Sequence, residues 1–514
     1  MIQARRLPVP SQELQGIPLL PDSGSSLSEY LKDASQTRGE ADQILFPTSE
    51  EEVAYILRQA NRTKTPITTA GAGTGLTGGR VPPGGILLST ERMDKIIRVD
   101  WDDKLQTGSV VVQPGVSLRK LEETLEKRGL FYPPNPGEKA AFIGGTVATN
   151  ASGARSFKYG PTRRYVQRLH VILSNGDLLE CVRGQERASG GRFKILLSDG
   201  ETVQVPIPSY TLPSVKNSAG YYAAPDMELI DLFIGSEGTL GVFTETELRI
   251  LKKPEKILSG IFFFPSEKDS LRFAHEARRM ARQQTQATVH PLAPRVLEFF
   301  DSRSLKLLSQ KHPAIPSQAG AAIFFEQEIR PEEETGVRSS WIQTGKAHGA
   351  LLEGSWISGD PQEQQGFREF RYDLPVLVNQ RVAANGFQKI GTDMAVPDDQ
   401  DEGMLDFYLE KLSASGINYC LFGHIGDNHL HANLLPKSPS EFEAAKTLYA
   451  EFARKAVELG GTISAEHGIG KLRIPYLEMM LGRQGLQEIA RVKKALDPNT
   501  LLNPGAIIAL ELLK

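Results

Sequence analysis

The sequence predicts a protein of mixed helix and strand, of α/β or α+β class, with more than one domain. Its 514 residues exceed what one hydrophobic core normally organises. In the first half, short apolar strands alternate with helices and with turns rich in glycine and proline, which is typical of these classes. The second half is more helical up to Leu412, and the charged, proline-containing stretch at 252–256 indicates a boundary between the two.

The elements of the first half can be assigned in chain order. Thr48 and Glu51 predict a capping box at the start of a helix, and Ile67–Ala70 is expected to be a strand that runs into a glycine cluster. The polar, alternating stretch at 182–208 predicts an inserted hairpin. A further strand and a helix with one apolar face are expected at 109–113 and at Leu118, Leu121 and Leu125.

The second half contains a segment rich in histidine, followed by a long helix. Ser440 and Glu443 predict a capping box at the start of this helix, and Gly460 and Gly461 predict its end. No internal repeat or low-complexity tract interrupts either half.

Composition and charge exclude several classes of protein. The 59 basic and 62 acidic residues are evenly mixed and leave a formal net charge of −3, so no nucleic-acid partner is expected. No stretch approaches the roughly 20 apolar residues of a membrane span, and Met1–Pro10 lacks the apolar run of a secretory signal. We expect a cytoplasmic protein, with any membrane association made through a partner.

The chain has only two cysteines, Cys181 and Cys420. Two isolated thiols supply neither a disulfide framework nor the roughly four ligands of an iron–sulfur cluster. A reducing compartment therefore fits best, and any iron–sulfur centre that receives electrons would lie on another chain.

A glycine-rich segment follows the strand predicted at 67–70. Gly73, Gly75 and Gly78 match the spelling G-x-G-x-x-G, but Arg80-Val81-Pro82-Pro83 comes next and prevents the helix that a Rossmann site requires. The segment remains either a flexible turn or a run of small residues whose N–H groups can approach a phosphate closely. Similar segments at 143–153 and 235–242 favour a large ligand threaded between two subdomains.

Histidine and glutamate residues cluster in the second half. His424, His429 and His431 lie within ten residues of one another, and Glu466 and His467 are adjacent further on. Imidazole and carboxylate ligands together suit Zn²⁺, Mn²⁺ or Fe²⁺. The clustering favours ligands over hydrogen-bonded core residues for His424, His431 and Glu466, whereas both interpretations stay open for His429. Asp427 is expected in a turn or beside the ligands.

With these motifs, the chain resembles the FAD-linked oxidase family with a vanillyl-alcohol-oxidase-type (PCMH-type) FAD domain, in the D-lactate, glycolate and D-2-hydroxyglutarate dehydrogenase branch. The resemblance covers about 46–505 and rests on the three glycine segments, Gly-His-x-Gly-Asp-x-x-Leu-His-x-Asn, Ser-x-Glu-His-Gly-x-Gly and Leu-Asn-Pro-Gly at 502–505. It implies an α+β fold with a two-subdomain FAD-binding domain at 1–255. A cap domain with an antiparallel sheet and the metal site would span 256–495, and a C-terminal segment, 496–514, would return to the FAD domain.

The resemblance also implies the cofactors and the residues that hold them. FAD would bind without a covalent link, because the first glycine segment offers no histidine for attachment. The residues expected around FAD are Gly71, Ala72, Gly73, Thr74, Gly75, Leu76, Pro136, Gly144, Gly145, Asn150, Gly153, Tyr159, Glu237, Gly238, Val242 and Asn503. The expected ligands of a divalent metal, zinc first and manganese or iron as alternatives, are His424, His431 and Glu466.

The remaining implied roles concern the substrate. His467 would be the catalytic base, Asn433 would contact substrate and Arg371 would bind its carboxylate, with an exposed structural arginine as the alternative at 371. The 2-hydroxyglutarate enzymes tend to have a lysine close to the aspartate of this segment, and the stretch from Lys389 to Pro397 has none so close. They also tend to have a threonine near the position that Pro375 occupies here. These departures favour a monocarboxylate substrate.

The function expected from this resemblance is oxidation of a small D-2-hydroxy acid, similar to D-lactate or glycolate, to the 2-keto acid by metal-assisted hydride transfer to flavin N5. The alternatives are a transferase similar to alkylglycerone-phosphate synthase, which would show a run of three histidines, a metal-free phenol oxidase, and a non-catalytic FAD-carrying electron-transfer subunit. The electron acceptor stays open among an iron–sulfur subunit, a flavoprotein, a cytochrome and a quinone. The oligomeric state also stays open, with a homodimer as one expectation.

Overall fold

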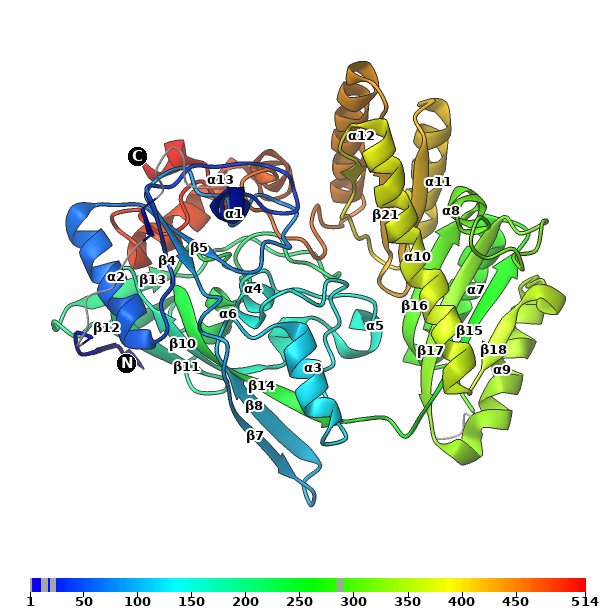
Figure 1. Ribbon diagram of the computed structural model, residues 1–514, viewed down its shortest axis with the longest axis horizontal. Helices are drawn as coiled ribbons and strands as arrows, with labels where there is room; N and C mark the ends of the chain where they lie inside the picture. Colours follow the sequence, from blue (N-terminus) through cyan, green and yellow to red (C-terminus); the bar gives the residue numbers. More distant parts are fainter. Residues whose placement is uncertain (1, 11–16, 19–24, 284–289) are drawn as a thin grey trace.

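The structure is a computed structural model, which describes residues 2–10, 17–18, 25–283 and 290–514. Figure 1 shows two lobes: the first holds the N-terminal half and the red C-terminal end, and the second holds the green to orange part of the chain. Among the described residues, no helix is long and apolar enough to cross a membrane. Mixed helices and strands with antiparallel sheets confirm the predicted fold class.

The first lobe begins with a small sheet that carries the first glycine segment. Its strands are β3 (Ile17–Pro18), β4 (Gln43–Leu45), β6 (Ile86–Ser89) and β5 (Ile67–Ala70), in that order, and the last three run parallel. Helix α2 (Glu50–Thr63) buries the predicted face, but its N-cap is Ser49, one residue after Thr48. Because β5 ends at Ala70, the glycine segment leaves the sheet at its edge.

A larger sheet forms the body of the first lobe. Its path is β2 (Arg5–Arg6), β11 (Asp177–Val182), β10 (Val166–Ile172), β14 (Val242–Lys252), β8 (Thr107–Val112) and β7 (Ile96–Asp102), with β9 (Leu130–Phe131) on β14. The predicted apolar face, Leu118, Leu121 and Leu125, is buried on α3 (Leu118–Glu126). The expected hairpin is present as β12 (Arg192–Leu196) and β13 (Thr202–Pro206), joined by β1 (Ile2–Gln3).

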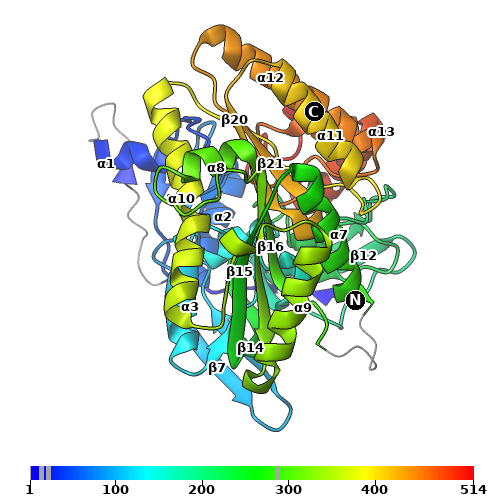
Figure 2. The ribbon, with the colours of Figure 1, turned by 90° about the vertical axis from the view of Figure 1, so that its right-hand side faces the viewer.

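The second lobe is built on one antiparallel sheet. Its order is β18 (Trp356–Ser358), β15 (Lys256–Phe264), β17 (Ala321–Ile329), β16 (Pro294–Asp301), β20 (Tyr419–His424), β21 (His429–Leu434) and β19 (Ile390–Gly391). Helices α7 (Glu267–Arg282) and α9 (Glu334–Ala347) lie on one side of it, and α8 (Ser302–Leu308) and α10 (Pro361–Asn385) on the other (Figure 2).

Alternation along β15 explains why both faces of this sheet are covered. Phe262 and Phe264 pack against Phe273 of α7, whereas Phe263 points the other way and meets Phe370 of α10. Successive side chains of a strand face opposite sides, so a continuous apolar run predicts a sheet buried on both faces.

Three long helices complete the second half. They are α11 (Asp401–Ala414), α12 (Pro439–Glu458) and α13 (Ile474–Leu496). Helix α12 is capped by Ser438, two residues before the predicted Ser440, and ends just before Gly460, which has a φ of 75°. Helix α13 packs against β13, and the segment after it pairs Leu502 with Ile67 of β5, so the C-terminal end lies against the first lobe.

The short helices are α1 (Ser25–Ser28), η1 (Glu29–Leu31), α4 (Ile143–Ala148), α5 (Ser156–Tyr159), η2 (Thr162–Arg164), α6 (Leu229–Phe233), η3 (Pro331–Glu333), η4 (Leu352–Gly354), η5 (Ile425–Asp427) and η6 (Leu510–Leu513). Of these, α4 carries Gly144 and Gly145 of the site described next, whereas α5 contacts β16 and η5 where the two lobes meet.

Candidate active site

A cavity of about 570 Å³ joins the three glycine segments to the His/Glu cluster. Sequence-predicted residues that line it are Gly71, Ala72, Gly73, Thr74, Gly75, Leu76, Pro136, Gly144, Gly145, Gly153, Glu237, Gly238, Arg371, His424, His431, Glu466, His467 and Asn503. Segments that lie more than 400 positions apart in the chain, from Gly71 to Asn503, therefore meet around one space.

Four predicted residues do not line this cavity. Asn150 faces a neighbouring cavity, and Tyr159 hydrogen-bonds to Glu328 of β17. Val242 is buried at the start of β14. Asn433 donates from its side chain to the carbonyl of His431. The order of motifs along the chain did not distinguish residues that face the cavity from those that support its wall.

The first glycine segment has the features of an anion cradle. Within the described chain, the backbone N–H groups from Ala72 to Thr77 have no hydrogen-bond acceptor. A Cβ added at Gly145 would meet nothing within 4 Å, and one at Gly71 would lie 4.0 Å from the Gly145 Cα, so both positions face open space. Free donors beside small residues suit a pyrophosphate.

Arg80 supports this segment from behind. Its guanidinium donates to the carbonyls of Gly71, Lys32 and Glu29, and a Cβ at Gly73 would lie 2.6 Å from it. Gly73 also has a φ of 79°, which a residue with a side chain adopts at a cost. Arg80, which follows the glycine segment where a Rossmann site would begin its helix, instead fixes the shape of the loop.

The candidate metal ligands come from two strands and one loop. His424 ends β20, His429 and His431 lie on β21, and Glu466 follows α12. Cross-strand pairing of His424 with His429 brings the imidazoles together. One ligand atom from each of these four residues lies within 4.8 Å of the others.

Hydrogen bonds orient two of the imidazoles for metal binding. His431 Nδ1 lies 2.8 Å from the Thr392 carbonyl, and His424 Nδ1 lies 2.5 Å from Glu298 Oε1. Each contact favours a proton on Nδ1, so Nε2 is the nitrogen available to a metal, as is usual for histidine ligands. His424 Nε2 itself lies 3.2 Å from Glu466 Oε1. The donor set therefore fits a divalent cation such as Zn²⁺.

Burial and charge separate the pKa values within the cluster. Burial disfavours a charge on His424, but Glu298 and Glu466 outweigh it and raise its pKa to about 9. Burial and the neighbouring histidines hold the pKa of His431 well below its usual range. Lys216 and His424 overcome the burial of Glu466 and keep its pKa well below the ordinary value.

His429 is fully buried, with Nε2 3.0 Å from Asp393 Oδ1 and Nδ1 3.9 Å from Glu466. The structure thus brings it to the ligand group and also gives it a carboxylate neighbour, so both interpretations of this residue have a geometric basis.

His467 projects into the cavity beside His431, with their rings stacked at 5.6 Å. Its Nδ1 lies 3.3 Å from Asp393 Oδ2 and 3.5 Å from the Arg473 guanidinium, so a carboxylate and a hydrogen-bond donor both approach this nitrogen. Burial lowers the pKa of His467 to about 4, against the opposing effect of Asp393. The ring is therefore neutral near pH 7 and able to take a proton.

Arg371, on α10, is an interior residue of the site. Its Nε lies 3.3 Å from Glu298 Oε2, and its side chain is 16% exposed and lines the cavity. Burial opposes its charge, but Glu298 raises the pKa of the guanidinium. An exposed structural arginine, the alternative considered from the sequence, does not describe this position.

Three charged residues in contact with the site were missed from the sequence: Asp393, Glu298 and Lys216. Asp393 is fully buried and accepts from the N–H groups of Glu466 and His467 and from Arg473. Lys216 forms an ion pair with Glu466 and lies 3.6 Å from Asp427. Each comes from a segment far from the histidine motif, and none carries a spacing that singles it out.

Comparisons with known proteins identify the family of this chain. Residues 41–182 match the family described as "FAD binding domain", and residues 253–507 match "FAD linked oxidases, C-terminal domain". The chain is 30% identical over 499 residues to "Glycolate oxidase subunit GlcD" of Bacillus subtilis (strain 168), covering 95% of this chain and 93% of the relative. It is 31% identical over 475 residues to "D-lactate dehydrogenase" of Anaerostipes hadrus, covering 90% and 89%.

Two further similarities are more distant. "D-2-hydroxyglutarate dehydrogenase" of Stutzerimonas stutzeri (strain A1501) is 27% identical over 500 residues, covering 94% of this chain and 95% of that one. A solved structure, "alkyldihydroxyacetonephosphate synthase in P212121", has a TM-score of 0.62 at 18% identity, covering 91% of this chain and 77% of that one. The second likeness concerns the fold alone.

The glycine-lined cavity and the two matched domains define an FAD-binding oxidoreductase. The chain belongs to the FAD-linked oxidase family, in the branch of the D-lactate, glycolate and D-2-hydroxyglutarate dehydrogenases.

Proposed function

We propose that this protein is a dehydrogenase that oxidises a small D-2-hydroxy acid, similar to D-lactate or glycolate, to the 2-keto acid. One observation carries the proposal: Arg371, His467 and the cluster of His424, His431 and Glu466 all open onto the glycine-lined cavity. A carboxylate binder, a base and a cation site are what this oxidation requires.

Each side chain has a defined task in this proposal. Arg371 would bind the substrate carboxylate through its guanidinium, with two N–H groups each donating to one carboxylate oxygen. His467 would accept the hydroxyl proton on its ring, while Asp393 accepts from its backbone N–H and keeps the residue in position. When bound, FAD would take up the hydride at N5 and a metal on His424, His431 and Glu466 would lower the pKa of the substrate hydroxyl.

The test is anaerobic bleaching of the flavin by a panel of D- and L-2-hydroxy acids, before and after chelation. We expect one D-acid to bleach the flavin, chelation to abolish bleaching, and Zn²⁺, Mn²⁺ or Fe²⁺ to restore it. A monocarboxylate should react fastest. Metal-replete, FAD-loaded protein that no acid bleaches would refute the proposal and favour a transferase or a non-catalytic electron carrier.

A further inference from the structure

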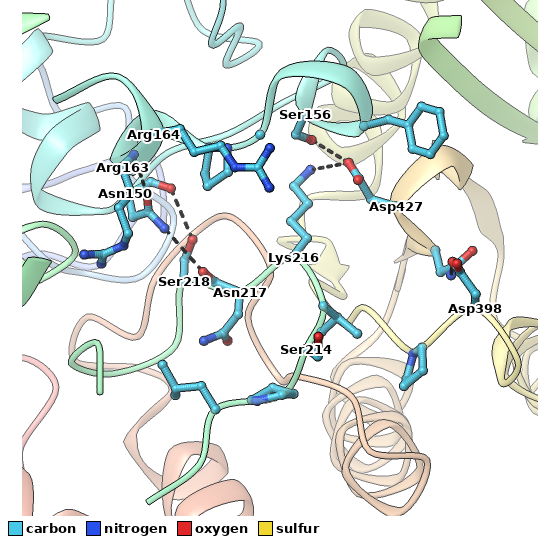
Figure 3. Close-up of a pocket in the computed structure, with 18 of the residues that line it drawn as sticks. Asn150, Ser156, Arg163, Arg164, Ser214, Lys216, Asn217, Ser218, Asp398 and Asp427 are labelled. Atoms are coloured by element: carbon cyan, nitrogen blue, oxygen red, sulfur yellow. Dashed lines mark hydrogen bonds and ion pairs between the residues drawn. The ribbon is translucent and has the colours of Figure 1, made fainter. Parts of the chain in front are cut away.

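A second cavity, of about 1010 Å³, lies beside the first and has no role in the function proposed above. It is bounded by residues 150–164 and 212–222 of the first lobe and by described residues near 281–294, 396–398 and 427–428 of the second. Figure 3 shows Arg164 and Lys216 directed into this space.

The wall between the two cavities is thin. Thr149 and residues 151–154 line the first cavity, whereas Asn150 and residues 156–158 line the second. At the His/Glu cluster, Glu466 faces the first cavity and its ion-pair partner Lys216 faces the second. Asp427 lines the second cavity three residues after His424. The Lys216–Glu466 ion pair therefore forms part of the wall between the second cavity and the candidate metal ligands.

The second cavity is suited to anions. Among its described lining residues, five are lysine or arginine and two are aspartate. Asp398 is paired with Arg282, and Asp427 with Lys216 and the Ser156 hydroxyl. Lys158 and Arg163 are paired with carboxylates outside the cavity lining, so the positive charge of the cavity rests on Arg164. Arg164 is exposed, and no hydrogen bond or ion pair of its side chain exists within the described chain. A carboxylate entering here would meet Arg164 first and Lys216 next.

The first cavity, by contrast, leaves little room for a second ligand to pass. A dinucleotide in contact with all three glycine segments would occupy most of about 570 Å³. A substrate that reaches Glu466 and His467 after the cofactor has bound then needs another path, and the second cavity adjoins the cluster from the other side.

We propose that the second cavity is the route by which small carboxylic acids reach the cluster and leave it, with Arg164 attracting them and the Lys216–Glu466 ion pair closing the inner end. This inference rests on the proposed function for its substrate class. The incoming carboxylate competes with Glu466 for the Lys216 ammonium, and the ion pair re-forms after the acid has passed.

Blocking the cavity chemically gives a direct test. Both native cysteines are buried, so Ser214→Cys, which places a thiol on the exposed cavity wall, creates a single accessible site for biotin-maleimide. Ser413→Cys, on the exposed face of α11, is the matched control. The probe is 2-hydroxyisobutyrate, which has the hydroxyl and carboxylate but no C2 hydrogen, and its binding to FAD-loaded protein is followed by the change in flavin absorbance.

We expect the label on Ser214→Cys to slow probe binding, and flavin reduction by the substrate acid, at least tenfold. The label on Ser413→Cys should change neither rate, and dithionite should reduce the flavin equally in both. Equal rates in the two labelled proteins would overturn the proposed route, as would the absence of both probe binding and reduction in unlabelled protein. A third outcome separates the two proposals. If no acid reduces the flavin, but the probe binds and the label on Ser214→Cys slows probe binding, the proposed function fails and the route stands.

A charge variant tests the same route without a bulky group. Arg164→Glu should lower the association rate about tenfold at low ionic strength and flatten its dependence on salt, leaving FAD content unchanged. Arg454→Glu makes the same change in net charge on the exposed side of α12, away from both cavities, and should have no such effect. Identical salt dependence in Arg164→Glu and Arg454→Glu would contradict the role given to Arg164.

Discussion

At the scale of single residues, the site depends on buried carboxylates that orient the groups in contact with the cavity. Asp393 holds the backbone of Glu466 and His467 and lies against His429, and Glu298 holds both His424 and Arg371. Charges of this kind are tolerated in a protein interior only when they are paired, so each carboxylate also fixes the geometry of its partners.

His467 gives the first prediction. His467→Asn removes the acceptor nitrogen in a side chain of smaller volume, and we expect turnover to fall roughly 10²–10⁴-fold with FAD content unchanged. Steady-state turnover and the flavin-to-protein ratio are measured on the same preparation. If flavin and activity disappear together, the residue has a structural role instead.

Glu237 gives a prediction in pH. Its buried carboxylate accepts from the N–H groups of Ile469 and Gly470, both at 2.7 Å, yet burial raises its pKa from 4.5 to about 7. The folded protein therefore binds this proton more tightly than the unfolded chain, and the resulting stabilisation is present below about pH 4.5 and lost as the pH rises to about 7.

Between about pH 4.5 and pH 7, we expect the free energy of unfolding of the wild type to fall by up to about 3 kcal/mol relative to that of Glu237→Gln. One pKa unit corresponds to about 1.4 kcal/mol. Thermal midpoints of the two proteins are measured in excess FAD from pH 4.5 to pH 7.5. The midpoint of the wild type should fall relative to that of Glu237→Gln as the pH rises. Parallel curves would show that Glu237 does not titrate in this range.

At the scale of elements, the start of α12 shows how the structure selects one of two similar capping sequences. Both Ser438 with Glu441 and Ser440 with Glu443 have the spacing of a capping box, and the helix begins at Pro439 with Ser438 as its cap. Proline is well suited to the first helical position because it has no N–H to leave unpaired there. That residue decides between the two serines.

The element-scale prediction compares these two serines. Ser438→Ala should destabilise the protein by about 1 kcal/mol, because the N–H of Glu441 loses its acceptor. Ser440→Ala loses only the exposed contact between the two hydroxyls, which both variants share, and should cost much less. Chemical denaturation of both variants measures the difference, and equal destabilisation would contradict the assignment of the cap.

At the scale of the whole molecule, the C-terminal segment forms part of the wall of the glycine-lined cavity. The Asn503 N–H donates to Ile67 in β5, and its side-chain amide donates to the carbonyls of Gly79 and Glu237. One residue thus connects the first and third glycine segments, which lie about 160 positions apart.

Asn503→Ala removes two side-chain hydrogen bonds of about 1 kcal/mol each, and we expect FAD release to become roughly tenfold to hundredfold faster. Asn499→Ala, which loses one bond to Asn61 outside the cavity, is the control and should release FAD at the wild-type rate. The rise in flavin fluorescence on dilution reports the release. Unchanged retention in Asn503→Ala would mean that the glycine segments hold FAD without this connection.

The sequence by itself predicted the fold class, the three glycine segments and the His/Glu cluster, because these depend on patterns that local physics imposes. Glycine is needed where a backbone must approach a ligand, imidazoles at alternate strand positions share a face, and apolar periodicity marks α2 and α3. Such signals lie within about ten residues of one another and can be recognised without knowing what packs against them.

Only the tertiary structure decided which residues face the cavity and which support it. Asn150, Tyr159, Val242 and Asn433 belong to the right segments but point elsewhere, and Arg371 proved to be interior. Asp393, Glu298 and Lys216 reach the cluster from separate loops and strands. Their places follow from how the two lobes meet, and the burial and charge pairing that result from long-range packing leave no periodic trace in the sequence.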